Sequence, residues 1–187
     1  MHMQKPTKFH KKLEALVGQW SGDEVMYPSP MNPEGSMTTG TYTSRWVTDG
    51  FAVVQEYEQR TDGELTFSGH GIFTYDPSEK CYLWYWFDSM GSVPHTGTKG
   101  QWSGNKVVWL SQSPMGHARY THAFARSGAC AFTIEYSEDG KKWGLMMEGH
   151  YSKSSGTKTA AKPAKKAAKK AAKKPAAKKP SKKTGKK

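Results

Sequence analysis

Short apolar runs separated by turn residues extend over most of the chain. From about residue 20 onwards, runs rich in Val, Thr, Tyr, Phe and Trp are interrupted every eight to twelve residues or so by Gly, Pro, Asn and Asp. This spacing is typical of an all-β meander. It predicts ten strands, at residues 20–27, 40–47, 51–60, 66–75, 82–88, 96–102, 106–111, 119–126, 131–137 and 143–152.

The segments between these strands predict tight hairpins. They contain Gly and Asn, which tolerate positive φ, beside Asp, Ser and Pro. Sequential hairpins therefore dominate the predicted topology. The clearest turn segments are Thr48-Asp49-Gly50, Thr61-Asp62-Gly63, Tyr75-Asp76-Pro77, Ser103-Gly104-Asn105 and Glu138-Asp139-Gly140.

The first eighteen residues and one aromatic run indicate how the sheet is completed. Phe9, Leu13, Leu16 and Val17 recur at helical spacing before Gly18, which predicts one short helix. The run YLWYWFD, residues 82–88, has large side chains on both faces, as in a strand covered on each side or lining a cavity. Closure would remove both unpaired edges, and the helix could cap one mouth. We expect an antiparallel up-and-down barrel of about ten strands.

A proline-rich stretch, residues 26–37, separates the first two predicted strands. We expect it to lie over one mouth of the barrel, either as a functional loop or as a long connection.

Charge divides the chain into two unlike parts. The whole chain has a formal net charge of +12, but the segment from Lys153 to Lys187 holds 15 Lys and no Arg, Asp, Glu or aromatic residue. The remainder carries 13 basic and 16 acidic residues, together with all the Trp, Tyr and Phe. We therefore expect an N-terminal segment with the helix at 1–18, a barrel domain at 19–152 and a disordered polycationic tail at 153–187.

The tail composition predicts binding to polyanions. Its composition resembles the C-terminal domain of histone H1, and lysine follows phosphates without reading bases, so nucleic acid binding independent of sequence is expected. A tail that only solubilises the protein, or that binds another polyanion, is the alternative. The residues expected to bind are Lys158, Lys162, Lys165, Lys166, Lys169, Lys170, Lys173, Lys174, Lys178, Lys179, Lys182, Lys183, Lys186 and Lys187.

The cysteines and the hydropathy pattern predict the redox state and the localisation of the protein. Cys81 and Cys130 have no metal-ligand or redox spacing, so two buried free thiols are expected. No run of eighteen apolar residues is present, which predicts a cytoplasmic protein without membrane insertion, located at the nucleoid if the tail binds DNA. The oligomeric state is left open.

Several motifs resemble the DUF1579 family over nearly the whole body. They are Leu16, Gly18 and Trp20 at the start, the YDP turn at 75–77, the DSMG segment at 88–91 and the SxDGxxW motif at 137–143. The resemblance implies a lipocalin-like or fatty-acid-binding-protein-like barrel of the calycin type, with no settled biochemical role. The Gly18-x-Trp20 pair also resembles the lipocalin opening, in which the tryptophan packs across the barrel floor.

Candidate ligand-binding residues follow from the barrel. An arginine inside an apolar barrel requires a carboxylate, a tyrosine or an anionic ligand. If Arg119 points inward, it would anchor a carboxylate as fatty-acid-binding proteins do, whereas the alternation with Tyr120 and His122 favours a solvated Arg119. The full set of ligand-binding candidates is Trp20, Arg45, Trp84, Trp86, Arg119 and Tyr151.

No cofactor is predicted, and haem is kept as an alternative. Trp20-x-Gly22 followed by Tyr27-Pro28 resembles the nitrobindin haem barrels, but these carry further glycines where this chain has Glu24 and Met26. His70 and His150 could face the lumen as haem ligands, although a surface histidine or a hydrogen-bonded core histidine is favoured for each. His117 and His122 are five residues apart and would point to opposite faces of a strand, which disfavours a paired metal site.

No catalytic residues are predicted, because neither a nucleophile elbow, a phosphate-binding glycine loop nor a zinc-protease motif is present. The leading hypothesis is a non-enzymatic barrel that holds a small apolar or anionic molecule, or a protein partner, and is tethered to nucleic acid by its tail. A haem or fatty-acid carrier with a solubilising tail, and a barrel enzyme, are the alternatives.

Overall fold

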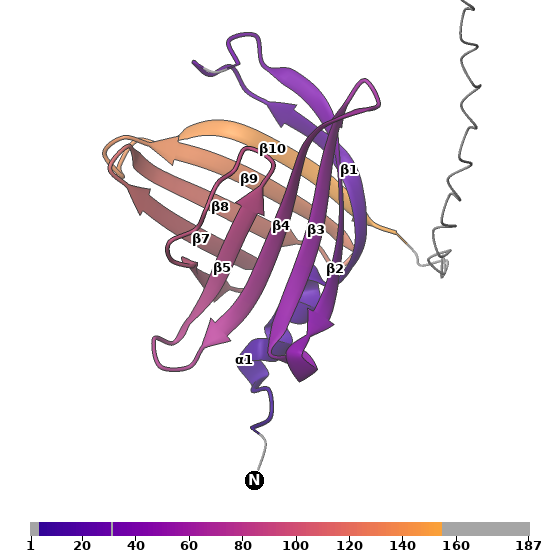
Figure 1. Ribbon diagram of the computed structural model, residues 1–187, viewed down its shortest axis with the longest axis vertical. Helices are drawn as coiled ribbons and strands as arrows, with labels where there is room; N and C mark the ends of the chain where they lie inside the picture. The colour runs from indigo at the N-terminus through magenta and orange to yellow at the C-terminus, as the bar shows by residue number, and fades with distance from the viewer. Residues whose placement is uncertain (1–3, 31, 155–187) are drawn as a thin grey trace, which may run out of the picture. The chain divides into compact units, whose positions relative to one another are not determined.

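The structure is a computed structural model that describes residues 4–30 and 32–154. Ten antiparallel strands form a closed barrel in which each strand pairs with its neighbours in the chain and β1 pairs with β10 (Figure 1). The predicted fold class is confirmed. The elements are α1 (Lys8–Lys11), η1 (Lys12–Leu16), β1 (Gly18–Met26), β2 (Ser36–Val47), η2 (Thr48–Gly50), β3 (Ala52–Thr61), β4 (Glu64–Asp76), β5 (Cys81–Asp88), β6 (Thr98–Ser103), β7 (Lys106–Ser113), β8 (Gly116–Phe124), β9 (Ala129–Ser137) and β10 (Gly144–Lys153).

The N-terminal helices close one end of the barrel. The predicted helix is present as one α-helical turn followed by a 3₁₀ turn, in which the Val17 N–H donates to the Glu14 carbonyl at 3.1 Å. Leu13 and Leu16 are fully buried, and the Trp20 indole N–H donates to the Leu16 carbonyl at 3.1 Å. Trp20 therefore ties β1 to the helix that covers this end.

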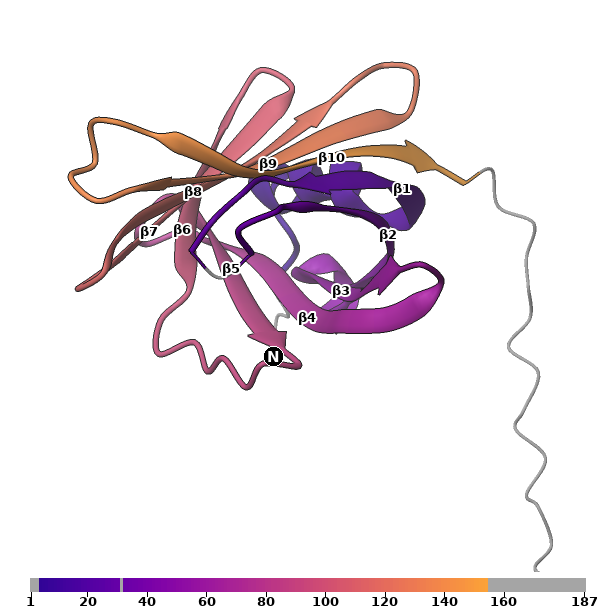
Figure 2. The same ribbon diagram turned by 90° about the horizontal axis from the view of Figure 1, so that it is seen from above.

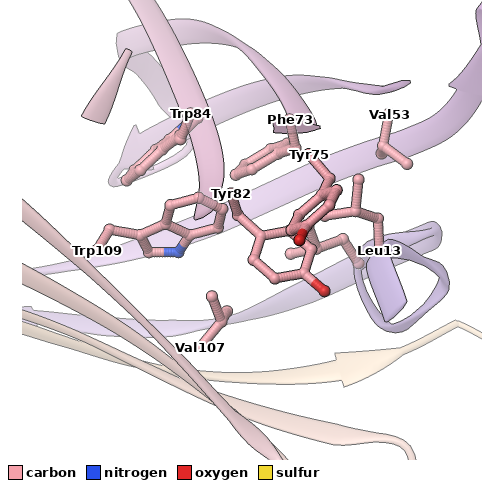
Figure 3. Close-up of a cluster of buried hydrophobic side chains, with 9 residues drawn as sticks. Leu13, Val53, Phe73, Tyr75, Tyr82, Trp84, Val107 and Trp109 are labelled. Atoms are coloured by element: carbon pink, nitrogen blue, oxygen red, sulfur yellow. The ribbon is translucent and has the colours of Figure 1, made fainter. Parts of the chain in front are cut away.

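The hydrophobic core lies next to these helices. Phe73 and Trp84 stack at 5.4 Å between ring centroids, and Trp109 packs against both (Figure 3). Such aromatic contacts stabilise a core through their large buried area and their ring geometry. The buried members of the core are Leu13, Leu16, Val53, Phe73, Tyr75, Tyr82, Trp84, Val107 and Trp109.

Strand β5 explains the aromatic run with large side chains on both faces. Tyr82 and Trp84 are buried in the barrel core. On the outer face, a methyl group placed on Gly97 would contact the side chains of Leu83 and Tyr85. The connection between β5 and β6 therefore packs on Leu83 and Tyr85 of the outer row and leaves Phe87 exposed, while the inner row packs into the core and lines the cavity.

The wall of the barrel is shortest between β5 and β6. Only three residue pairs join them, from Tyr82 with Gly100 to Trp84 with Thr98. The rest of β5 continues to Asp88 without a partner in β6, and the connection of residues 89–97 projects outward (Figure 2). The end of the barrel opposite the helices is therefore the open end.

Strand boundaries differ modestly from those predicted. β8 begins at Gly116 rather than at 119, because the β7–β8 ladder continues to the pair Ser113 with Gly116. The connection between β1 and β2, described at residues 27–30 and 32–35, starts and ends at the open end, since β1 runs toward that end and β2 returns from it. Both cysteines are buried and free, as predicted.

The predicted tail lies outside the described residues except for its first two positions. The Lys153 N–H donates to the Gly128 carbonyl, and the Ser154 N–H donates to the Gln19 carbonyl at 2.8 Å. No helix in residues 4–30 and 32–154 is both long and apolar enough to cross a membrane.

Candidate functional site

A cavity of about 610 Å³ occupies the half of the barrel next to the open end. This size lies within the range of pockets that hold small organic molecules, roughly 300–1,000 Å³. Its lining follows from the strand alternation, which places every second residue of a strand on the inner face of the barrel. The lining residues are Met26, Tyr42, Gln55, Tyr57, Gln59, Thr66, Phe67, Trp84, Trp86, Asp88, Met90, Ser92, Thr98, Tyr120, His122, Phe132, Ile134, Met147 and Tyr151.

Aromatic side chains form the floor and one wall of this cavity. The Trp84 ring meets Trp86 at 5.4 Å and Tyr120 at 5.2 Å, both in edge-to-face arrangement. Phe132 packs against His122 at 4.5 Å between ring centroids. These contacts fix the rings before any ligand arrives, so the aromatic surface is largely preformed.

A buried carboxylate lies behind the opposite wall. Glu24 is 0% exposed, and both of its oxygens accept hydrogen bonds from neighbouring strands. Oε1 accepts from the Tyr57 hydroxyl at 2.7 Å and from the Tyr151 hydroxyl. Oε2 accepts from the Thr38 hydroxyl at 2.7 Å and from Gln59 Nε2 at 2.8 Å. Four donors on two oxygens match the acceptor capacity of a carboxylate. We call these five residues the Glu24 network.

The backbone makes room for this carboxylate. A methyl group placed on Gly40 of β2 would lie 1.9 Å from Glu24 Oε1. Any side chain at position 40 would therefore displace the carboxylate from its donors. Glycine is required at position 40 because the Glu24 carboxylate lies so close to the backbone of β2.

The two tyrosines of the network are held in their protonated form. Burial, and then the charge of Glu24, raise the pKa of Tyr57 and of Tyr151 above the usual value for tyrosine. Each phenol therefore keeps the single proton that it donates to Glu24. The remaining lone pairs of both oxygens are hydrogen-bond acceptors.

His122 is the histidine that lines the cavity. It is 5% exposed, and burial lowers its pKa to about 3, so the ring is neutral near pH 7. The Trp109 indole N–H donates to His122 Nδ1 at 3.2 Å, which assigns the ring proton to Nε2.

Asp88 lies at the mouth of the cavity. It ends β5, and its Oδ1 accepts from the backbone N–H groups of Met90 and Ser92 at 3.0 and 3.3 Å. These bonds shape the start of the connection to β6. Asp88 is the one acidic residue among the lining residues.

Apolar side chains are exposed around the open end. Met90 in the connection after β5 is 70% exposed, and Met115 in the turn between β7 and β8 is 82% exposed. Met37, Leu65, Phe87, Val93, Leu145 and Met146 lie at the same end and are also exposed. This end of the barrel therefore exposes apolar side chains to solvent, and of these Met90 also lines the cavity.

Three of the predicted ligand-binding residues come together in the cavity. Trp84 and Trp86 from β5 form part of the aromatic wall, and Tyr151 from β10 belongs to the Glu24 network. Trp20 is buried at the closed end instead, where it stacks on Tyr42 at 5.7 Å. It has the floor position that the lipocalin resemblance implies.

The two predicted arginines lie on the outer face of the barrel. Arg45 is exposed in the outward row of β2. Arg119 makes a two-point ion pair with Glu135, at 2.7 and 2.6 Å, and stacks over the Trp143 ring at 4.2 Å. The hypothesis that Arg119 anchors a carboxylate inside the barrel does not agree with this position. Strand alternation points Tyr120 and His122 inward, and hence Arg119 outward.

The predicted haem ligands also lie outside the cavity. His70 Nδ1 is 2.8 Å from Glu56 Oε1 on the outer face, and the His150 side chain is 71% exposed, 3.6 Å from Glu148. Neither can reach a group bound in the barrel, so the haem hypothesis based on these two residues is not supported. Across residues 4–30 and 32–154, no cluster of three or more His, Cys, Asp or Glu side chains could hold a metal ion.

Sequence reasoning missed Tyr57, Gln59 and His122 as cavity residues, and it missed Glu24 as the carboxylate that lies behind them. The alternation in β1 could have predicted that Glu24 points inward, because Glu24 lies four positions after Trp20 and shares its face. Its partners from β2, β3 and β10 depend on pairing between distant strands, for which the sequence contains no local signal.

Comparison with known proteins identifies a matching sequence family and several solved structures with a similar barrel. Residues 5–153 match the sequence profile of a family described as a protein of unknown function, DUF1579. None of the curated proteins matches the sequence.

Three solved structures resemble the barrel. Rv2717c from M. tuberculosis has a TM-score of 0.59 at 10% identity, covering 79% of this chain and 98% of that one. The S-type phycobiliprotein lyase CPES from Guillardia theta has a TM-score of 0.54 at 10% identity, covering 78% and 90%. A mutant of the fluorescent protein UnaG has a TM-score of 0.48 at 15% identity, covering 77% and 99%. At these identities the first two likenesses show the fold alone.

Proposed function

The chain belongs to the DUF1579 family of proteins of unknown function, and from this premise we propose that its barrel binds a small, mainly apolar molecule without transforming it. The observation that carries the proposal is the preformed aromatic cavity at the open end of the barrel. A filled barrel would have packed this half with side chains, as the half next to α1 is packed.

Two further features support binding rather than catalysis. The acidic and histidine side chains nearest the cavity are engaged in structural hydrogen bonds, as Glu24, Asp88 and His122 are. Exposed apolar side chains at the open end, Met90 among them, offer an apolar surface beside the mouth of the cavity. The pocket therefore has the properties of a ligand site: concave, mostly apolar and with few polar groups.

A neutral fluorescent probe tests this proposal. N-phenylnaphthylamine is expected to bind the full-length protein with micromolar affinity and to quench tryptophan emission, because Trp84 and Trp86 line the cavity. The substitution Ile134→Trp fills part of the cavity and should weaken binding by about tenfold or more, a loss of about 1.4 kcal/mol or more.

The matched control places the same bulk on the other face of β9. Thr133 is the neighbour of Ile134 and points outward, so Thr133→Trp should leave probe affinity within about twofold of the unsubstituted protein. Equal loss of binding in both variants, or no binding by the unsubstituted protein, would contradict the proposal.

We further propose that the lysine-rich segment tethers the barrel to nucleic acid. The supporting observation is compositional: 15 Lys and no acidic residue in the last 35 residues, beside a body with more acidic than basic residues. Lysines neutralise phosphates and release counterions, which gives binding independent of base sequence. Any nucleic acid affinity should therefore depend on this segment and not on the barrel.

A gel-shift comparison tests the tether. The shortened protein should end at Ser154, because Lys153 and Ser154 make backbone hydrogen bonds to the barrel. The full chain is expected to bind duplex DNA, with log K falling against log salt at a slope of about −6 to −7 if half of the lysines engage phosphates. The shortened protein should not bind. Equal binding by both forms would refute the tether, and no binding by the full chain would leave solubilisation as the role of the segment.

A further inference from the structure

The polar side of the cavity presents hydrogen-bond acceptors. Tyr57 and Tyr151 give their single protons to Glu24, so only their lone pairs remain available. Gln59 uses its amide N–H groups on Glu24 Oε2 at 2.8 Å and on the Tyr57 hydroxyl at 3.2 Å, which leaves its carbonyl oxygen as an acceptor. At this wall a ligand meets the Tyr151 hydroxyl oxygen and the Gln59 carbonyl oxygen as acceptors, while the Tyr57 oxygen already accepts from Gln59.

The charges near the cavity are negative. Asp88 lines the mouth, and the Glu24 carboxylate lies immediately behind Tyr57 and Tyr151. Among the described residues that line the cavity, none is Lys or Arg. The two arginines adjacent in sequence to lining residues, Arg60 and Arg119, are paired with Glu58 and Glu135. His122 adds no positive charge near pH 7.

The opposite wall suits the apolar body of an organic cation. Trp84, Trp86 and Tyr120 line it with aromatic rings, which offer a large apolar contact area. A carboxylate ligand would instead face Glu24 and Asp88 with no basic side chain beside it among the described residues. The buried donors without a partner that line the cavity in this part of the chain, Trp84 Nε1 and the Tyr42 hydroxyl, are both neutral. The cavity therefore disfavours the fatty-acid class of ligand.

On the basis of the proposed function, we infer that the cavity takes an amine, with its protonated nitrogen toward the Glu24 network and its apolar body against Trp84, Trp86 and Tyr120. The aromatic rings supply most of the contact area, and the acceptors fix the orientation. The preference for a cation over an anion comes from the negative charges of Glu24, behind Tyr57 and Tyr151, and of Asp88 at the mouth.

Three matched probes test the inference on the full-length protein by calorimetry: naphthylethylamine, naphthylethanol and naphthylacetate. They share the aromatic body and differ in charge. The amine is expected to bind about tenfold or more tightly than the carboxylate, a difference of about 1.4 kcal/mol or more, with the alcohol between them. Equal affinities, or tighter binding of the carboxylate, would overturn the inference.

Two variants locate the source of the selectivity. Glu24→Gln keeps the shape of the side chain and should lower the amine-to-carboxylate ratio severalfold. Asp88→Asn removes the charge at the mouth, does not disturb the core, and should lower the ratio as well. The control is Glu56→Gln, whose carboxylate pairs with His70 on the outer face and whose substitution should leave the ratio unchanged. A ratio that stays constant in every folded variant would overturn the inference.

The outcomes also separate this inference from the proposed function. If naphthylethanol and N-phenylnaphthylamine bind while the amine shows no advantage, the barrel is a binding protein without selectivity for cations. If no probe binds, the proposed function itself fails.

Discussion

Replacing Glu24 with alanine is expected to lower the free energy of unfolding by about 3–5 kcal/mol, the loss typical of removing one partner from a buried charged group. The substitution leaves four donors, from Thr38, Tyr57, Gln59 and Tyr151, without their acceptor at a buried site in the barrel wall. A loss of this size corresponds to a fall in melting temperature of about 10 °C for a domain of this length. Calorimetry or thermal unfolding followed by circular dichroism measures it.

The comparison for this prediction is Glu56→Ala. Glu56 is exposed and pairs with His70 on the outer face, so its removal should change stability by no more than about 0.5 kcal/mol. If the Glu24→Ala and Glu56→Ala variants had the same melting temperature, the Glu24 network would not stabilise the barrel.

Acidification is expected to destabilise the protein through His122. The pKa of His122 is about 3 in the folded chain because the ring is buried, whereas an unfolded histidine has its ordinary value of 6.5. The unfolded state therefore binds a proton first as pH falls, and protonation favours unfolding. The stability is present in full above about pH 6.5 and is lost progressively toward pH 3. Between pH 7 and pH 4 the loss is about 3 kcal/mol.

The His122→Gln variant isolates this contribution. Its amide oxygen can still accept from the Trp109 indole N–H, but it does not titrate. Urea unfolding at several pH values should show that the variant lacks most of the acid sensitivity of the unsubstituted protein between pH 6.5 and 4.5. The same slope in both proteins would mean that His122 is protonated in the folded barrel.

The barrel was predictable because local patterns determine it. Turn residues such as Asp62 and Gly63 adopt the positive φ values that a tight hairpin requires, 51° and 83°. The aromatic run of β5 predicted a strand covered on both faces, and the structure supplies both the cavity and the covering connection. Each hairpin is readable within about a dozen residues, so the order of strands follows the chain.

The residues that line the cavity were less predictable. They depend on which face of each strand points inward and on which residues of distant strands lie opposite one another. Trp84, Trp86 and Tyr151 were found from their size alone. Arg119 was a candidate because inward and outward facing were both admissible for its strand, and the ion pair with Glu135 settles its outward position.

The histidine hypotheses show the same limit. His70 and His150 were chosen by their neighbours in sequence, yet both face outward beside a glutamate. His122 faces inward, and only the register of β8 against β7 and β9 brings it to Trp109 and Phe132. Register between strands is set by the whole barrel.

The central claim is that the open half of the barrel holds a small molecule, and the indole N–H signals of the seven tryptophans test it most directly by nuclear magnetic resonance. On addition of N-phenylnaphthylamine, the signals of Trp84 and Trp86 should shift, since both line the cavity. The signals of Trp20 at the closed end and Trp143 on the outer face should stay in place. Shifts confined to Trp143, or no shift at saturating probe, would contradict the claim.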